Sequence, residues 1–299
     1  MTVAEASVHL LSRIAAAPIS WGVCEVPDWG FQLAPERVLG EMRDLGVVAT
    51  EFGPEGFLPS GPIDKAETLA AAGLKAVGGF VPIVLHDAGN DPVPAIEAEL
   101  DSFLAAGATR LVLSADTGQV GYDSRPTLSE QEWDTLLANL DRLVQTAAAR
   151  GVVASIHPHV GTMIESSHDV ERVLNGSQIG LCLDTGHLLI GGTDPVELAR
   201  DNATRISHVH LKDVRRALAE KVQRKELTYT DAVRQGLYTP LGTGDIDIRA
   251  IVTFLEGAGY AGYYVLEQDT ILTENPAEGQ GPLADVRTSI DFIAGLATP

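Results

Sequence analysis

Residues 180–213 read GLCLDTGHLLIGGTDPVELARDNATRISHVHLKD, and this stretch decides the fold. Two short apolar segments, 180–184 and 206–210, have the length and composition of buried strands, and an amphipathic stretch separates them. A strand, a helix and a second strand in this order form the βαβ unit of a parallel sheet. The same alternation continues in both directions along the chain, which predicts repeated βα units.

The alternation predicts eight strands. They cover 15–21, 47–52, 75–85, 110–115, 152–157, 180–184, 206–210 and 263–267. Helices are predicted at 35–45, 63–72, 95–105 and 129–150, and each is followed closely by a glycine that suits a left-handed C-cap. Eight units close a barrel more naturally than they form an open sheet, and no glycine-rich phosphate fingerprint follows the first strand. The sequence therefore predicts an α/β fold, a single (β/α)8 TIM-barrel domain over residues 1–299.

The connection after the seventh strand is unusually long, at about 211–262. It carries a charged helical stretch at 215–235 and a turn-rich segment at 240–245. A loop that follows a barrel strand lies on the catalytic face, so this connection is expected to form a lid or a substrate wall. The alternative is an insertion without a catalytic role.

The composition argues against several classes of partner. The 299 residues include 41 acidic and 21 basic side chains, and the formal net charge of −20 repels phosphate backbones and anionic lipid headgroups. No apolar run is long enough to span a membrane, and the N-terminus lacks the pattern of a secretory signal. Cys24 and Cys182 form no disulfide framework. We therefore expect a cytoplasmic protein that binds neither nucleic acid nor membranes.

Four potential metal ligands end the last four predicted strands: His157, Asp184, His210 and Glu267. Because the carboxyl ends of barrel strands meet at one mouth, these residues are expected to surround one point. Imidazole and carboxylate donors without a thiolate suit one divalent metal ion. Mn²⁺ or Co²⁺ is favoured, with Zn²⁺, Fe²⁺ or Mg²⁺ as alternatives. His159 replaces His157 as the ligand if the fifth strand ends later.

Further side chains near strand ends are candidates for acting on a substrate. Glu51 ends the second strand, and His187 and Lys212 lie just beyond the sixth and seventh; all three are candidate proton-transfer groups. Trp21, at the end of the first strand, offers an apolar wall for a ring. A purely structural role is the alternative for each. His208 is expected to pack between the barrel and the helices.

Over nearly its full length the chain resembles the xylose isomerase-like barrel family of sugar isomerases and epimerases. The resemblance rests on Asp184-Thr-Gly-His187, on His208-Val-His210-Leu-Lys-Asp213 and on a terminal acid on the last strand. Three other motifs are similar to those of the inosose dehydratases within this family: Thr50-Glu51-Phe52-Gly53-Pro54, His157-Pro-His159-Val-Gly-Thr162 with Glu165, and Leu266-Glu267-Gln268-Asp269.

The resemblance implies a metal-dependent dehydratase that removes water from a cyclic polyol ketone such as 2-keto-myo-inositol. It assigns His159 and Glu165 to substrate binding. His157 stands where the family usually has a glutamate, which disfavours a two-glutamate proton shuttle and favours dehydration. The alternatives are an isomerase or epimerase of a keto-sugar or inosose, and a non-catalytic sugar-binding barrel. The expected partner is a small polyol ketone or sugar, and a homo-oligomer stays open.

Overall fold

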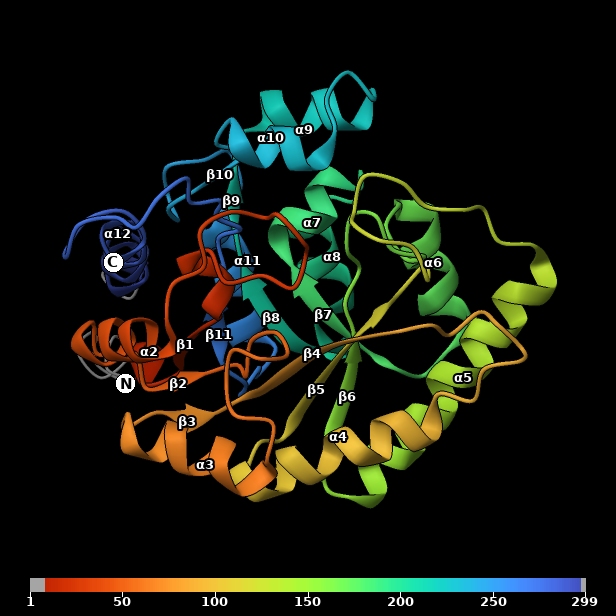
Figure 1. Ribbon diagram of the computed structural model, residues 1–299. Coiled ribbons are helices and arrows are strands. Elements are labelled where there is room, and N and C mark those ends of the chain that lie inside the picture. The colour runs from red at the N-terminus through yellow and green to blue at the C-terminus, as the bar shows by residue number, and fades with distance from the viewer. Residues whose placement is uncertain (1–8, 297–299) are drawn as a thin grey trace.

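A computed structural model describes residues 9–296 and shows parallel strands inside a ring of helices (Figure 1). The strands follow one another around the sheet in the order β3-β2-β1-β11-β8-β7-β6-β5-β4. Their bounds, in that order, are Lys75–Ala76, Ala49–Thr50, Ile14–Ala16, Tyr264–Leu266, Ile206–Leu211, Gly180–Asp184, Val153–Ile156, Arg110–Ala115 and Gly78–Ile83. Each neighbouring pair in this order is parallel.

The barrel closes at Val77, which lies between β3 and β4. These two segments are parts of one predicted strand. β3 pairs with β2, whereas β4 pairs with β5. Val77 joins the two sides, since its N–H donates to the carbonyl of Thr50 and its own carbonyl accepts the N–H of Arg110. The nine segments therefore form eight barrel strands, and the predicted (β/α)8 barrel is confirmed.

Helices cover the outside of the barrel. They are α2 (Pro35–Asp44), α3 (Pro62–Ala71), α4 (Val93–Ala106), α5 (Glu130–Ala149), α6 (Ser167–Gly176), α7 (Thr185–Ile190), α8 (Pro195–Asn202), α11 (Ile248–Gly257) and α12 (Pro282–Leu296). The four predicted helices correspond to α2, α3, α4 and α5. Gly107 caps α4 with a φ of 68°, as the sequence predicts. No helix within residues 9–296 is both long and apolar enough to cross a membrane.

The prediction that the first strand continues to Trp21 is wrong. β1 ends at Ala16, and residues Pro18–Trp21 form the short 3-10 helix η1. Proline has no N–H to donate to a neighbouring strand, so the chain leaves the sheet at Pro18. Several other strands are shorter than predicted. Glu51 and Glu267 therefore lie one residue beyond their strands, at the carboxyl end of the barrel.

Strand alternation decides which side chains point into the barrel. Ile14 and Leu266 belong to the large core between the strands and the helices, whereas their neighbours Ala15 and Val265 form a separate small cluster. Successive strand residues point to opposite faces, so Ala15 and Val265 face the barrel interior. Small interior residues leave space above them for the polar side chains of the site.

The long connection after β8 folds over the carboxyl end of the barrel, at the top of Figure 1. It contains α9 (Arg216–Gln223), α10 (Tyr229–Arg234) and an antiparallel pair formed by β9 (Asp213–Val214) and β10 (Tyr238–Thr239). The Asp213 carboxylate holds the turn that follows β10. It accepts the backbone N–H groups of Gly242, Gly244 and Ile246.

Candidate active site

The four predicted metal ligands meet at the carboxyl ends of four neighbouring strands. His157 follows β6, Asp184 ends β7, His210 lies in β8 and Glu267 follows β11. Nδ1 of His210 is 2.8 Å from Oε2 of Glu267 and 3.5 Å from Oδ2 of Asp184. Nε2 of His157 is 3.1 Å from the same Asp184 oxygen. The structure thus places all four side chains around one buried point.

Glu51 joins this group from the opposite side of the barrel. Its Oε1 accepts hydrogen bonds from Nε2 of His208 at 2.7 Å and from Nε2 of His210 at 3.0 Å. The expectation that His208 packs between the barrel and the helices is wrong, because residues two apart in a strand share a face. His208 therefore points inward like His210, and it is fully buried.

Lys212 provides a buried positive charge beside these carboxylates. Its Nζ lies 2.9 Å from Oε1 of Glu267, 3.5 Å from Oδ2 of Asp184 and within hydrogen-bond distance of Asp269. Burial alone would lower the pKa of Lys212, but Asp184, Asp269 and Glu267 hold it well above its usual value. The lysine is therefore an ammonium ion at neutral pH.

The carboxylates outnumber the positive charges. Burial would raise their pKa values, but the neighbouring histidines and Lys212 hold all four below the usual range; these carboxylates are Glu51, Asp184, Glu267 and Asp269. Burial lowers the pKa of His157 to about 4, so this imidazole is neutral. Burial would also lower the pKa of His210, but Cys182, Glu267 and Glu51 hold it well above its usual value. A divalent cation would balance the excess negative charge.

The donor atoms fit such a cation. Glu51 is an ionised acceptor, so Nε2 of His210 carries a hydrogen, and Nδ1 is the nitrogen available to a metal ion. Nδ1 faces Glu267 and Asp184, and neither Nδ1 of His210 nor Oε2 of Glu267 makes a hydrogen bond with any residue described. A divalent ion at this point would replace a proton on Nδ1 and bring the two carboxylates and the imidazole together around one positive charge. The residues present therefore suit a divalent metal ion.

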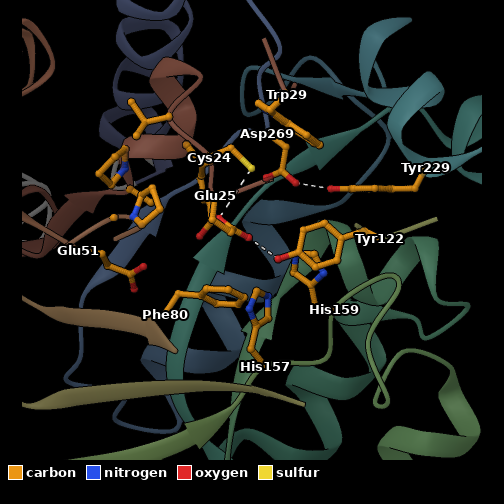
Figure 2. A pocket seen from close by; sticks show the side chains of 17 residues that line it. Cys24, Glu25, Trp29, Glu51, Phe80, Tyr122, His157, His159, Tyr229 and Asp269 are labelled. Atoms are coloured by element: carbon orange, nitrogen blue, oxygen red, sulfur yellow. Dashed lines mark hydrogen bonds between the residues drawn. The ribbon is translucent and has the colours of Figure 1, made fainter. Parts of the chain in front are cut away.

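A cavity opens above this group and is lined by acidic and aromatic side chains (Figure 2). Its lining includes Glu51, His157, Glu267, Asp269, His159, Glu25, Cys24, Trp29, Phe80, Tyr122 and Tyr229. The Tyr122 hydroxyl donates to Oε1 of Glu25, which links the loop after β5 to the loop after β1 over the cavity. An apolar ring face bearing hydroxyl groups would match this mixture of aromatic and carboxylate groups.

A second hydrogen-bonded group surrounds Asp269. The Tyr229 hydroxyl and the Lys212 ammonium both donate to its carboxylate. Nζ of Lys212 also donates to Nε2 of His187 at 3.1 Å, and the same nitrogen lies 3.5 Å from Oδ2 of Asp269. The predicted catalytic residues His187 and Lys212 therefore lie just behind the cavity wall, joined to it through Asp269.

His159 forms part of the cavity wall itself. Its ring lies 3.7 Å from that of His187, measured between centroids, and its Nδ1 is 2.7 Å from the carbonyl oxygen of Val160. This carbonyl can only accept, so Nδ1 is the protonated nitrogen and Nε2 keeps its lone pair. Burial and the neighbouring His187 lower the pKa of His159 well below its usual value.

Two of the predicted substrate-binding residues do not line the cavity. Trp21 is fully buried, and its Nε1 donates to Glu41 in α2 at 2.8 Å. Glu165 accepts the N–H of Gly161 at 2.8 Å and so stabilises the loop after β6. The expectation that Trp21 forms an apolar wall is corrected: Trp29 takes that place, because the chain turns at Pro18 and carries Trp21 outward.

Sequence reasoning missed several residues of the cavity. Asp269 was visible as the second acid of Glu267-Gln268-Asp269, but nothing local indicates that it pairs with Lys212. Glu25 and Tyr122 come from the loops after β1 and β5, and Tyr229 begins α10 in the long connection after β8. No strand periodicity reveals the direction of these side chains, so only the folded structure assigns them to the cavity.

Comparison with known proteins identifies related barrels. The family model for the xylose isomerase-like TIM barrel matches residues 83–295. An inosose dehydratase of Geobacillus thermodenitrificans is 31% identical over 89% of this chain and 93% of its own length. The rhizopine catabolism protein MocC of Rhizobium meliloti is 34% identical over 95% of this chain and 88% of its own length.

Solved structures share the same fold. An L-ribulose 3-epimerase has a TM-score of 0.68 at 19% identity and covers 95% of this chain and 94% of its own. The IOLI protein, crystallised with a bound zinc atom, has a TM-score of 0.67 at 14% identity and covers 96% of this chain and 98% of its own. At such identities the likeness concerns the fold alone.

Proposed function

Because the chain belongs to the xylose isomerase-like TIM barrel family, we propose that it is a metal-dependent hydro-lyase that removes water from a cyclic polyol ketone such as 2-keto-myo-inositol. The choice of reaction rests on one observation: relatives named inosose dehydratase match this chain along nearly their whole length. We propose that the whole chain forms one domain and acts in the cytoplasm in the breakdown of inositol.

The proposed metal ligands are His157, Asp184, His210 and Glu267. The geometry that supports them is the convergence of two imidazoles and the Glu267 carboxylate around Asp184. A divalent ion bound there, with Mn²⁺ or Co²⁺ favoured, would polarise the ketone oxygen and so acidify the neighbouring C–H.

Elimination of water needs one group that accepts the α-proton and one that protonates the departing hydroxyl. His159 suits the first task, because Nε2 keeps a lone pair and makes no hydrogen bond with the residues described. The second proton would come from the group around Asp269, which lines the cavity and which the Lys212 ammonium and His187 contact from behind. Glu51 is less suited to proton transfer, because two histidines already donate to its Oε1.

The cavity wall supports a ring-shaped substrate. Trp29, Phe80 and Tyr229 offer apolar faces, whereas Glu25 offers a carboxylate that accepts hydrogen bonds from hydroxyl groups. These side chains come from three different loops or strands, so they contact different edges of one small molecule. A cyclic polyol presents both kinds of surface, C–H faces and hydroxyl edges.

The test is an assay of the purified protein with 2-keto-myo-inositol. We expect ultraviolet absorbance from the dione product, its loss on treatment with a chelator, and its return with Mn²⁺ or Co²⁺. The Asp184→Asn variant is expected to lose both bound metal and activity. Metal analysis of the purified protein measures the ion directly.

Two other outcomes would contradict dehydration. Incorporation of solvent deuterium into recovered substrate without any dione would indicate the alternative isomerase or epimerase. Substrate binding without turnover or exchange, unchanged by chelator, would indicate a non-catalytic sugar-binding barrel.

A further inference from the structure

We infer that Glu51 is a positioning residue that fixes the tautomer and the orientation of His210 toward the divalent metal. The inference rests on the metal centre of the proposed function, and it assigns Glu51 a role other than proton transfer. Three observations support it: the position of Glu51 across the barrel, the shared hydrogen bonds, and the unpartnered nitrogen of His210.

Glu51 reaches His210 through the barrel interior. Its strand, β2, is separated from β8 by β1 and β11 in the sheet, so the two residues are not on neighbouring strands. The contact spans 159 positions in the chain, and each side chain exposes at most 4% of its surface. A carboxylate buried this deeply must be paired with donors, which limits its freedom to turn toward a substrate.

The hydrogen bond decides which nitrogen of His210 is available. Glu51 has only acceptor oxygens when ionised, so it selects the tautomer with hydrogen on Nε2. Nδ1 is then the nitrogen left for a metal ion, and this atom is 2.8 Å from Oε2 of Glu267. Carboxylates that hold a metal-ligating histidine in this way orient the ring and raise its basicity.

His208 stabilises this arrangement from the same strand face. Its Nε2 donates to the same Oε1 of Glu51 at 2.7 Å, and it is completely buried. With two buried donors on one oxygen, the Glu51 carboxylate has a fixed position relative to His210. By contrast, Nδ1 of His157 makes no hydrogen bond with any described residue, so no side-chain hydrogen bond at Nδ1 orients that ring.

The test measures Zn²⁺ binding to metal-free protein by calorimetry, without substrate. Glu51→Ala is expected to weaken binding by about 10- to 100-fold, the usual effect of losing such a partner. Glu51→Gln keeps a neutral acceptor and should weaken binding less. Glu25→Gln is the matched control, because Glu25 lines the cavity without contacting a ligand; its Zn²⁺ affinity should equal that of the wild type. Circular dichroism checks that each variant is folded.

A spectroscopic measurement keeps the inference testable if Glu51→Ala does not fold. In ¹⁵N-histidine-labelled protein loaded with Zn²⁺, the ring shifts of His210 should show hydrogen on Nε2, and Glu51→Gln should change them. Wild-type Zn²⁺ affinity together with unchanged ring shifts in Glu51→Gln would overturn the inference. If the wild type dehydrates its substrate but Glu51→Gln keeps both the wild-type Zn²⁺ affinity and the wild-type ring shifts, the inference fails and the proposed function stands. If the wild type binds Zn²⁺ tightly, Glu51→Gln binds it weakly and neither forms dione, the inference stands and the proposed reaction fails.

Discussion

Nζ of Lys212 lies 2.9 Å from Oε1 of Glu267, a proposed metal ligand. Both side chains are buried, and the same ammonium also contacts Asp184 and Asp269. Lys212 therefore neutralises part of the charge that the metal would balance. This arrangement allows the carboxylates to stay together at low dielectric in the metal-free protein.

Replacing Lys212 with Met should destabilise the metal-free protein strongly. The variant leaves three buried carboxylates without their lysine, and loss of one partner from a buried ion pair costs about 3–5 kcal/mol. Added Mn²⁺ should recover part of this loss. Urea unfolding with and without Mn²⁺ measures both effects. Lys221→Met, on the exposed side of α9, is the control. Equal stability of the two variants would contradict the prediction.

Tyr229→Phe should reduce activity more than stability. The variant removes the hydroxyl that donates to Asp269 and contacts the Tyr238 hydroxyl at 3.1 Å. We expect a loss of about tenfold in kcat/KM, equivalent to about 1.4 kcal/mol. Steady-state kinetics with 2-keto-myo-inositol measure it. Tyr260→Phe removes a hydroxyl that bonds to the carbonyl of Tyr263, outside the cavity lining, and should leave kcat/KM unchanged. A similar loss in both variants would argue against a role at the site.

Asp213→Asn should loosen the turn after β10. Each Asp213 oxygen accepts two backbone N–H groups, and the amide of Asn cannot accept with its nitrogen. Unsatisfied buried donors cost about 1–3 kcal/mol each, so stability should fall and cleavage by protease near residues 240–246 should become faster. Thermal unfolding and limited proteolysis measure these changes. Asp245→Asn, where one backbone N–H is affected, should have a smaller effect. No increase in cleavage would count against the anchoring role.

The stability of the loop after β6 should depend on pH through Asp169. Burial alone would raise the pKa of Asp169, but hydrogen bonds from Ser166 and the charge of Arg125, 2.8 Å away, lower it. A lowered pKa means that the carboxylate stabilises the fold above its unfolded pKa of about 3.9 and loses this effect as pH falls through the folded value. Asp169→Asn should therefore be less stable than the wild type at pH 7, with the difference shrinking below about pH 4. Urea unfolding at both pH values tests this; a constant difference would contradict it.

The sequence by itself determined the barrel and the strand ends that carry the candidate ligands. Apolar runs separated by amphipathic stretches mark each βα unit, and parallel strands all end at one mouth. The positions of Asp184 and His210 after two such runs therefore predict their meeting. This works because secondary structure and burial follow local periodicity, which is written in neighbouring residues.

Only the tertiary structure decided which partners these side chains take. The contacts of Glu51 with His208 and His210, and of Lys212 with Asp269, join residues far apart in the chain. Pro18 breaks the strand locally, but only packing against α2 decides that Trp21 is buried and leaves the cavity wall to Trp29. Cross-barrel pairs and loop directions are set by the closure of the whole sheet, and no local pattern in the sequence encodes them.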